Sequence, residues 1–132
     1  MILYLDSSAI VKLVHREAET SGLREYLREY RADALVSSAL ARVEVVRAVL
    51  DGGPALVAAA RRQVARLSLM SLDIAVLDDA ATLSPSGLLR SLDAIHLASA
   101  RRLGADLRAV VTYDHRLAAG AASLALPVAT PA

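Results

Sequence analysis

The first nine residues, MILYLDSSA (residues 1–9), decide how the rest of this chain is interpreted. Ile2 to Leu5 form a short apolar run that Asp6 closes, a pattern typical of a strand buried on both faces in a parallel sheet. Asp6 would then lie at the carboxyl end of that strand, the edge at which open α/β sheets bind ligands. By itself Asp6 is better explained as the cap of a following helix. The question is therefore whether other acids reach the same edge.

Composition limits the possible classes of protein. The 132 residues suffice for one domain, residues 1–132, and a hydrophobic content of 55% excludes disorder. No apolar run is long enough to cross a bilayer and the start is not a signal peptide, so we expect a cytoplasmic protein without a membrane segment. The absence of cysteine excludes disulfides, thiolate chemistry and cysteine zinc sites. A net charge of +1 gives no argument for or against nucleic-acid binding.

Short strands and helices are expected to alternate along the whole chain. The strands are predicted at residues 2–5, 34–37, 69–73, 109–112 and 126–129. Helices are predicted over residues 9–16, 23–30, 39–50, 54–67, 75–83, 88–103 and 115–122, with Asp78 and Asp79 near the start of one and a turn at 84–87. This alternation predicts an α/β fold in which helices cover both faces of a parallel sheet of about five strands.

Four of the fourteen acids stand out by their place in this scheme: Asp6, Glu44, Asp93 and Asp114. Two of them end strands and two lie near the start of helices that follow strands, so all four could meet at one sheet edge. Each also has an ordinary explanation. The two strand-end acids can cap helices, Glu44 can pair with Arg47, and Asp93 can pair with His96.

A cluster of carboxylates raises the pKa of its members unless a cation lies between them. A ligand set made only of oxygen suits Mg²⁺ or Mn²⁺, and such a site serves phosphoryl chemistry by activating water and stabilising a leaving oxygen. The three histidines have no spacing typical of a zinc site.

The motifs around these acids resemble the PIN-domain family, and within it the VapC-type toxins of bacterial toxin–antitoxin pairs. The stretches that carry the resemblance are LDSSAIVKL (5–13), SSALARVEVVRA (37–48), LLRSLDAIHLASA (88–100) and VTYDHRL (111–117). The resemblance implies a three-layer α/β/α sandwich and a ribonuclease that depends on Mg²⁺ or Mn²⁺. It also implies that the four acids are metal-site residues, with Ser7 and Thr112 as supporting polar groups and structural roles for Arg47 and His96.

The sequence therefore predicts a metal-dependent endoribonuclease toxin that hydrolyses RNA phosphodiester bonds with a metal-activated water. Asp6, Asp93 and Asp114 would hold the metal directly, while Glu44 would complete the cluster or act through water. The alternative is a non-catalytic nucleic-acid or protein binding module with the same fold. A receiver domain is discounted because the only lysine is Lys12, early in the chain. A phosphatase with an aspartate nucleophile is discounted because its second aspartate is replaced by a serine two residues after the first.

The implied partners are an RNA substrate, a cognate antitoxin and a second copy of the chain. A domain this small cannot bury so many apolar residues, and the surplus should form an exposed patch that marks an interface. We expect this patch on the helices of residues 9–31 and 39–67, at Val11, Leu13, Leu40 and Val49. An arginine of the antitoxin could pair with the carboxylates and displace metal.

Overall fold

Five parallel strands form one sheet in the order β3-β2-β1-β4-β5 in the computed structural model, which describes residues 1–84 and 89–132. The strands are β1 (Ile2–Leu5), β2 (Ala34–Ser38), β3 (Ser68–Met70), β4 (Leu107–Val111) and β5 (Val128–Ala129). β1 occupies the centre, with β2 on one side and β4 on the other. The expected parallel sheet is confirmed.

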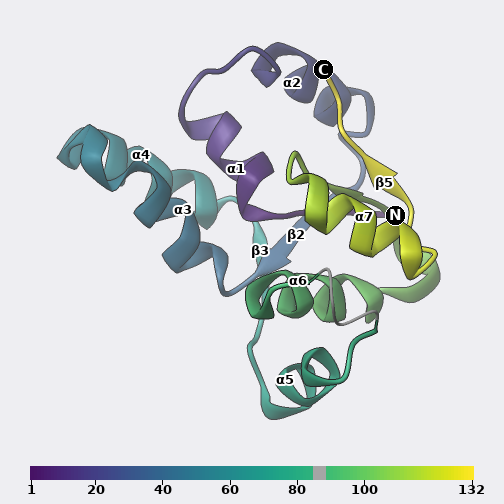
Figure 1. The fold of residues 1–132 in the computed structure, drawn as a ribbon. Helices are drawn as coiled ribbons and strands as arrows, with labels where there is room; N and C mark the ends of the chain where they lie inside the picture. Colours follow the sequence, from purple (N-terminus) through teal and green to yellow (C-terminus); the bar gives the residue numbers. More distant parts are fainter. Residues whose placement is uncertain (85–88) are drawn as a thin grey trace.

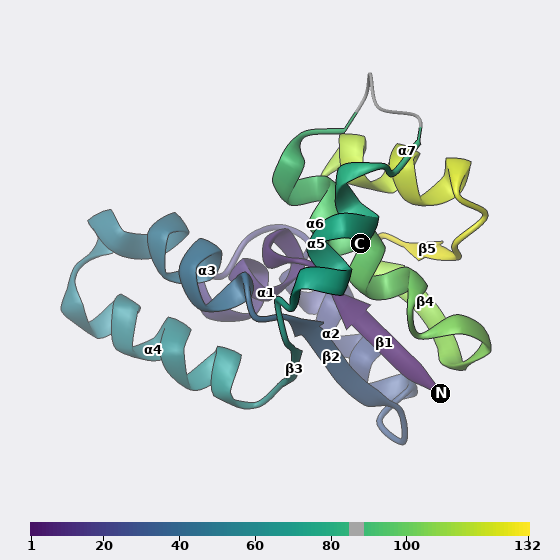
Figure 2. The ribbon, with the colours of Figure 1, turned by 90° about the horizontal axis from the view of Figure 1, so that it is seen from below.

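Seven helices lie within the described residues and cover both faces of the sheet (Figures 1 and 2). They are α1 (Ser7–Val14), α2 (Thr20–Glu29), α3 (Ala41–Val49), α4 (Pro54–Ala65), α5 (Ile74–Ala81), α6 (Ser91–Arg101) and α7 (His115–Ser123). Short 3₁₀ turns span Leu50–Gly52 and Gly104–Asp106. The expected three-layer α/β/α arrangement is thus confirmed.

The alternation of side chains along β1 divides the core into two halves. Leu3 and Leu5 are fully buried in a cluster with apolar residues of α1, α2, α3 and α4. Tyr4 points to the opposite face and is buried among residues of α5, α6 and α7. Because both faces of β1 are covered, its sequence is a continuous apolar run, and the residue after it emerges at the edge of the sheet between the two helical layers.

The segment after β3 departs from the sequence prediction. The strand predicted at 69–73 ends at Met70, because Asp73 caps α5 by accepting a hydrogen bond from the backbone N–H of Val76 at 2.9 Å. Asp78 and Asp79, expected near the helix start, lie in the second half of α5 instead. The predicted turn at 84–87 and the start of the predicted helix 88–103 involve residues 85–88, outside the described part, and α6 begins at Ser91.

The apolar patch predicted from the sequence is partly wrong. Leu13 and Val49 belong to the buried core, and Val11 and Leu40 are half-buried, because α1 and α3 pack against α4 as well as the sheet. Large exposed apolar side chains do occur within the predicted range 39–67, at Val43 and Leu50 around α3. The others lie outside both predicted ranges, at Met1 and, around α5 and α6, at Leu72, Ile74, Leu77 and Leu92. Among the described residues, no helix combines the length and apolar character of a membrane span.

Candidate active site

All four acids singled out in the sequence line one pocket of about 410 Å³, together with residues from the starts of α1, α6 and α7. The lining residues are Asp6, Ser7, Ser8, Glu44, Arg90, Ser91, Leu92, Asp93, His96, Asp114 and Leu117. Asp6 follows β1 and Asp114 follows β4, the strand paired with it. Glu44 lies in the first turn of α3 and Asp93 in the first turn of α6. The predicted convergence at one sheet edge is therefore present.

Asp6 is a helix cap and a pocket residue at once. Its Oδ1 accepts hydrogen bonds from the backbone N–H of Ala9 at 3.0 Å and from the Ser8 hydroxyl at 2.7 Å. Its Oδ2 accepts a bond from the Thr112 hydroxyl at 2.6 Å. Asp6 is only 3% exposed, and this burial raises the pKa of its carboxyl group despite the three donors. Within residues 1–84 and 89–132, Asp6 forms no ion pair.

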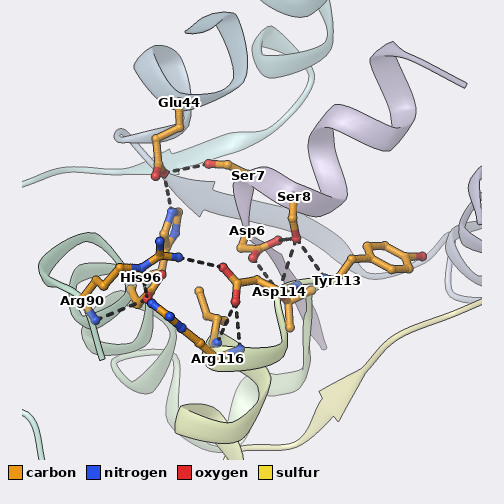
Figure 3. A network of polar contacts seen from close by, with 12 residues as sticks. Asp6, Ser7, Ser8, Glu44, Arg90, His96, Tyr113, Asp114 and Arg116 are labelled. Atoms are coloured by element: carbon orange, nitrogen blue, oxygen red, sulfur yellow. Dashed lines mark hydrogen bonds and ion pairs between the residues drawn. The ribbon is translucent and has the colours of Figure 1, made fainter. Parts of the chain in front are cut away.

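Thr112 and Ser8 connect the end of β4 to the start of α1. Thr112 is fully buried, and its hydroxyl accepts a hydrogen bond from the backbone N–H of Asp114 at 3.0 Å while it donates to Asp6. The Ser8 hydroxyl likewise accepts a bond from the backbone N–H of Tyr113 at 2.9 Å (Figure 3). These two hydroxyls fix the relative position of the two strand-end acids.

Glu44 is held by a chain of polar groups that begins inside the core. The hydroxyl of buried Tyr4 lies 2.8 Å from Nδ1 of His96, and Nε2 of His96 lies 2.6 Å from Oε1 of Glu44. His96 thus makes a polar contact through each of its two ring nitrogens. Ser7 also donates to Oε1, at 2.8 Å. Partial burial acts to raise the pKa of Glu44, but the hydrogen bond and the electrostatic attraction of His96, together with the bond from Ser7, outweigh it and leave the pKa below its usual value.

Asp93 and Asp114 share one cation. Arg90 precedes α6, and its Nε lies 3.3 Å from Oδ2 of Asp93 while its Nη2 lies 3.4 Å from Oδ2 of Asp114 (Figure 3). Oδ1 of Asp114 meanwhile caps α7 by accepting hydrogen bonds from the backbone N–H groups of Arg116 and Leu117. As in Asp6, one carboxylate oxygen of Asp114 caps the following helix.

The residues of this pocket fit a hard divalent cation by their chemistry, although they are not gathered around one point. Within residues 1–84 and 89–132, no three acidic or histidine side chains already form a group able to hold a metal ion. The four carboxylates are instead paired with hydroxyls, His96 or Arg90. Oxygen donors of this kind suit Mg²⁺ or Mn²⁺, and a bound cation would give the buried Asp6 carboxylate an ion-pair partner.

Two ordinary explanations of these acids fail in the structure, and some contacts were not foreseen. Within the described residues Glu44 forms no ion pair with Arg47, nor Asp93 with His96, because His96 pairs with Glu44. Sequence reasoning assigned no site role to Ser8, Arg90 or Tyr4. The spacing of Ser8 two residues after Asp6 and of Arg90 three residues before Asp93 is a signal for local pairing, whereas Tyr4 inside an apolar strand gives none.

Comparison with known proteins gives the family. The family model of the PIN domain matches residues 3–122. The chain belongs to the PIN domain family. The resemblance drawn from the four motifs is thereby confirmed.

Two relatives and one solved structure of similar fold come from Mycobacterium tuberculosis. Ribonuclease VapC46 is 53% identical over 129 residues, which cover 98% of this chain and 97% of that protein. Ribonuclease VapC35 is 41% identical over 132 residues, with the same two coverages. The crystal structure of VapC20, described as a Sarcin-Ricin loop cleaving toxin, superimposes with a TM-score of 0.76 at 16% identity and covers 98% of this chain and 99% of that chain. This last likeness supports the fold.

Proposed function

We propose that this PIN domain is a metal-dependent endoribonuclease that acts as the toxin of a toxin–antitoxin pair. The expectation of a toxin ribonuclease is confirmed by the ribonucleases of VapC type that the chain resembles along nearly its whole length. The observation that carries the chemistry is the single pocket at the carboxyl edge of the sheet that four carboxylates line. Without cations such a concentration of negative charge would oppose both the folded state and the approach of RNA phosphates.

The proposed roles follow from where each carboxylate lies. Asp6, Asp93 and Asp114 would hold Mg²⁺ or Mn²⁺, which when bound would activate a water molecule and stabilise the leaving oxygen. Among the described residues, both side-chain hydrogen bonds to Glu44 go to Oε1, and the lone pairs of Oε2 would serve the metal or a water molecule. Ser7 and Thr112 would orient Glu44 and Asp6, since each donates a short hydrogen bond to its acid.

The chain that joins Tyr4, His96 and Glu44 gives the site its rigidity. His96 is 3% exposed and is bonded through both ring nitrogens, so its imidazole has a fixed orientation. Because Glu44 is bonded to His96 on α6 and Ser7 on α1, its position depends on both helical layers. A fixed carboxylate loses little conformational entropy when it binds a metal ion. The role proposed for His96 is therefore that of a positioning residue.

We further propose a cytoplasmic protein whose partners are RNA, a cognate antitoxin and a second copy of the chain. The support for a protein partner is the exposed apolar group Leu72, Ile74, Leu77 and Leu92, of which Leu92 also lines the acidic pocket. Large apolar side chains exposed on two helices that contact each other are typical of interfaces. Light scattering of the purified protein, alone and with the product of an adjacent small gene, tests both protein partners. A monomer that does not bind that product contradicts them.

The metal requirement is tested by Asp93→Asn, with Asp78→Asn as the matched control on an exposed position of α5. In the wild type, Mn²⁺ at 100 times its Kd should stabilise the folded protein by about 2.7 kcal/mol, because the unfolded chain has no site. Asp93→Asn should lose most of this gain, while Asp78→Asn keeps it. Thermal unfolding with and without Mn²⁺ measures both. An equal gain in all three proteins would locate the metal elsewhere.

The nuclease itself is tested by Asp6→Asn, which keeps the size and capping ability of the side chain but removes its charge. RNA cleavage under Mn²⁺ should fall by roughly a hundredfold or more, the order expected when an electrostatic stabiliser of the transition state is lost. The alternative, a binding module without catalysis, predicts that the wild type binds RNA and does not cut it under any divalent metal. Cleavage at the wild-type rate by Asp6→Asn would remove Asp6 from the mechanism.

A further inference from the structure

Arg90 places a guanidinium group where two proposed metal ligands meet. Its Nε and Nη2 contact Oδ2 of Asp93 and Oδ2 of Asp114, so one side chain bridges the first turn of α6 and the residue that caps α7. Among the described residues that line the pocket, it is the only one with a guanidinium. A cation already occupies the space between these two carboxylates.

The contacts of Arg90 are longer than the hydrogen bonds that hold Asp6 and Glu44 in the same pocket. Its two ion pairs measure 3.3 and 3.4 Å, whereas charge-assisted hydrogen bonds are usually about 2.7–2.9 Å long. The side chain is 63% exposed, so solvent screens both pairs. By contrast, Asp6 and Glu44 accept bonds as short as 2.6 Å from partners that are buried. Arg90 is the partner that can be displaced most easily.

We propose that Arg90 and the metal ion are alternative partners of Asp93 and Asp114, and that Arg90, once displaced, binds a phosphate of the RNA. A divalent cation and a guanidinium compete for the same carboxylate oxygens, so the metal must release Arg90 before it can use both acids. The freed guanidinium stays at the mouth of the pocket, because the backbone of Arg90 leads directly into α6. Its fork of N–H donors matches the geometry of phosphate oxygens.

This arrangement couples metal binding to substrate binding. Without metal, the acids retain Arg90 and the pocket presents its remaining carboxylates to the negative RNA backbone. With metal, the negative charge is compensated and a guanidinium becomes available, so RNA and metal each favour the binding of the other. Arg90 would then be a switch that keeps the site unreceptive to RNA until the metal has bound. This inference rests on the proposed function, because it requires a metal at the acids.

The matched control is Arg116, which lies two residues after Asp114 and is exposed. Its backbone N–H donates a hydrogen bond to Oδ1 of Asp114, but its side chain forms no ion pair with any residue in 1–84 or 89–132. Arg90→Gln and Arg116→Gln therefore remove the same charge near the same pocket, and only the first removes the bridge. The backbone N–H of Arg90 also donates to Asp93, at 3.4 Å, and this contact survives the substitution.

The first measurement is calorimetric titration of Mn²⁺ into each protein without RNA. Arg90→Gln should lower the Kd for Mn²⁺ by about fivefold relative to the wild type, the order expected for the removal of two exposed ion pairs that compete with the metal. Arg116→Gln should lower it by less than about twofold, through long-range charge alone. Equal changes in the two variants, or weaker Mn²⁺ binding by Arg90→Gln, would overturn the proposal.

The second measurement is steady-state cleavage of a fluorogenic single-stranded RNA of mixed sequence at saturating Mn²⁺. Arg90→Gln should raise KM by about fivefold while Arg116→Gln changes it by less than about twofold, since only Arg90 is positioned to contact the bound phosphate. The proposal requires both effects in Arg90→Gln, a lower Kd for Mn²⁺ and a higher KM for RNA. The absence of either effect overturns the inference. If the wild type itself binds no Mn²⁺, the proposed function fails instead.

Discussion

Replacing Thr112 by valine removes one hydroxyl from the centre of the site and nearly preserves the shape of the side chain. Thr112 is fully buried, donates to Asp6 at 2.6 Å and accepts from the backbone N–H of Asp114 at 3.0 Å. A hydrogen bond to an ionised group contributes about 1.5–3 kcal/mol. The additional methyl group opposes the loss, by about 0.8 kcal/mol for a buried carbon. With the Asp114 N–H also losing its acceptor, we expect the free energy of unfolding to fall by about 2 kcal/mol.

Urea unfolding followed by circular dichroism at pH 7 in a chelator measures this loss. The total stability of a domain is about 5–15 kcal/mol, so Thr112→Val should still fold. Thr130→Val, at an exposed position after β5, should change stability by no more than about 0.5 kcal/mol. Thr112→Ser keeps the hydroxyl and should recover most of the difference. A value for Thr112→Val equal to that of the Thr130 control would refute the role assigned to this hydrogen bond.

Three further changes test other contacts of the structure. Tyr4→Phe should cost about 1–2 kcal/mol of stability, because the buried Nδ1 of His96 loses its partner, and it should slow RNA cleavage; unchanged urea unfolding would contradict this. The wild type should lose the stability that Asp33 contributes when the pH becomes acid, and Asp33→Asn should not show this part of the loss. The bond from Arg108 lowers the folded-state pKa of Asp33, so the stability that it contributes is present above the unfolded-state pKa and disappears as the pH falls through the folded-state pKa. Thermal unfolding of both proteins from about pH 2 to about pH 7 measures this, and equal pH dependence of the wild type and the variant would contradict it. Leu97→Ala should destabilise the protein by about 2–5 kcal/mol, since Leu97 is fully buried in α6, and a loss near zero in urea would show that the site is not packed as described.

The position of the four acids could be predicted because it follows from rules of sheet geometry. Apolar runs that end in aspartate locate the ends of β1 and β4, and parallel strands bring these ends to one edge. Asp6 and Asp114 do cap helices, as the ordinary explanation requires, but each carboxylate has a second oxygen that faces other partners. The capping and the pocket explanations were therefore never exclusive.

The contacts that complete the site depend on packing that the sequence does not reveal. Arg90 bridges two acids only because the starts of α6 and α7 lie beside each other, and no local pattern predicts that placement. Tyr4 belongs to an apolar strand, and its link to His96 follows from how α6 crosses the sheet. The buried positions of Leu13 and Val49 likewise reflect the way α1, α3 and α4 enclose one another.

The central place of β1 in the sheet has a consequence for the synthesis of the protein. β1 leaves the ribosome before β2 and can pair with it early, but its other neighbour, β4, arrives much later. Asp6 and Thr112 bond to each other across 106 positions of the sequence. A nascent chain that ends before β4 holds its first acid without Thr112 or Asp114, and pairings so distant in sequence form slowly. A ribonuclease made in the midst of ribosomal, transfer and messenger RNA thus carries no assembled site during most of its own translation.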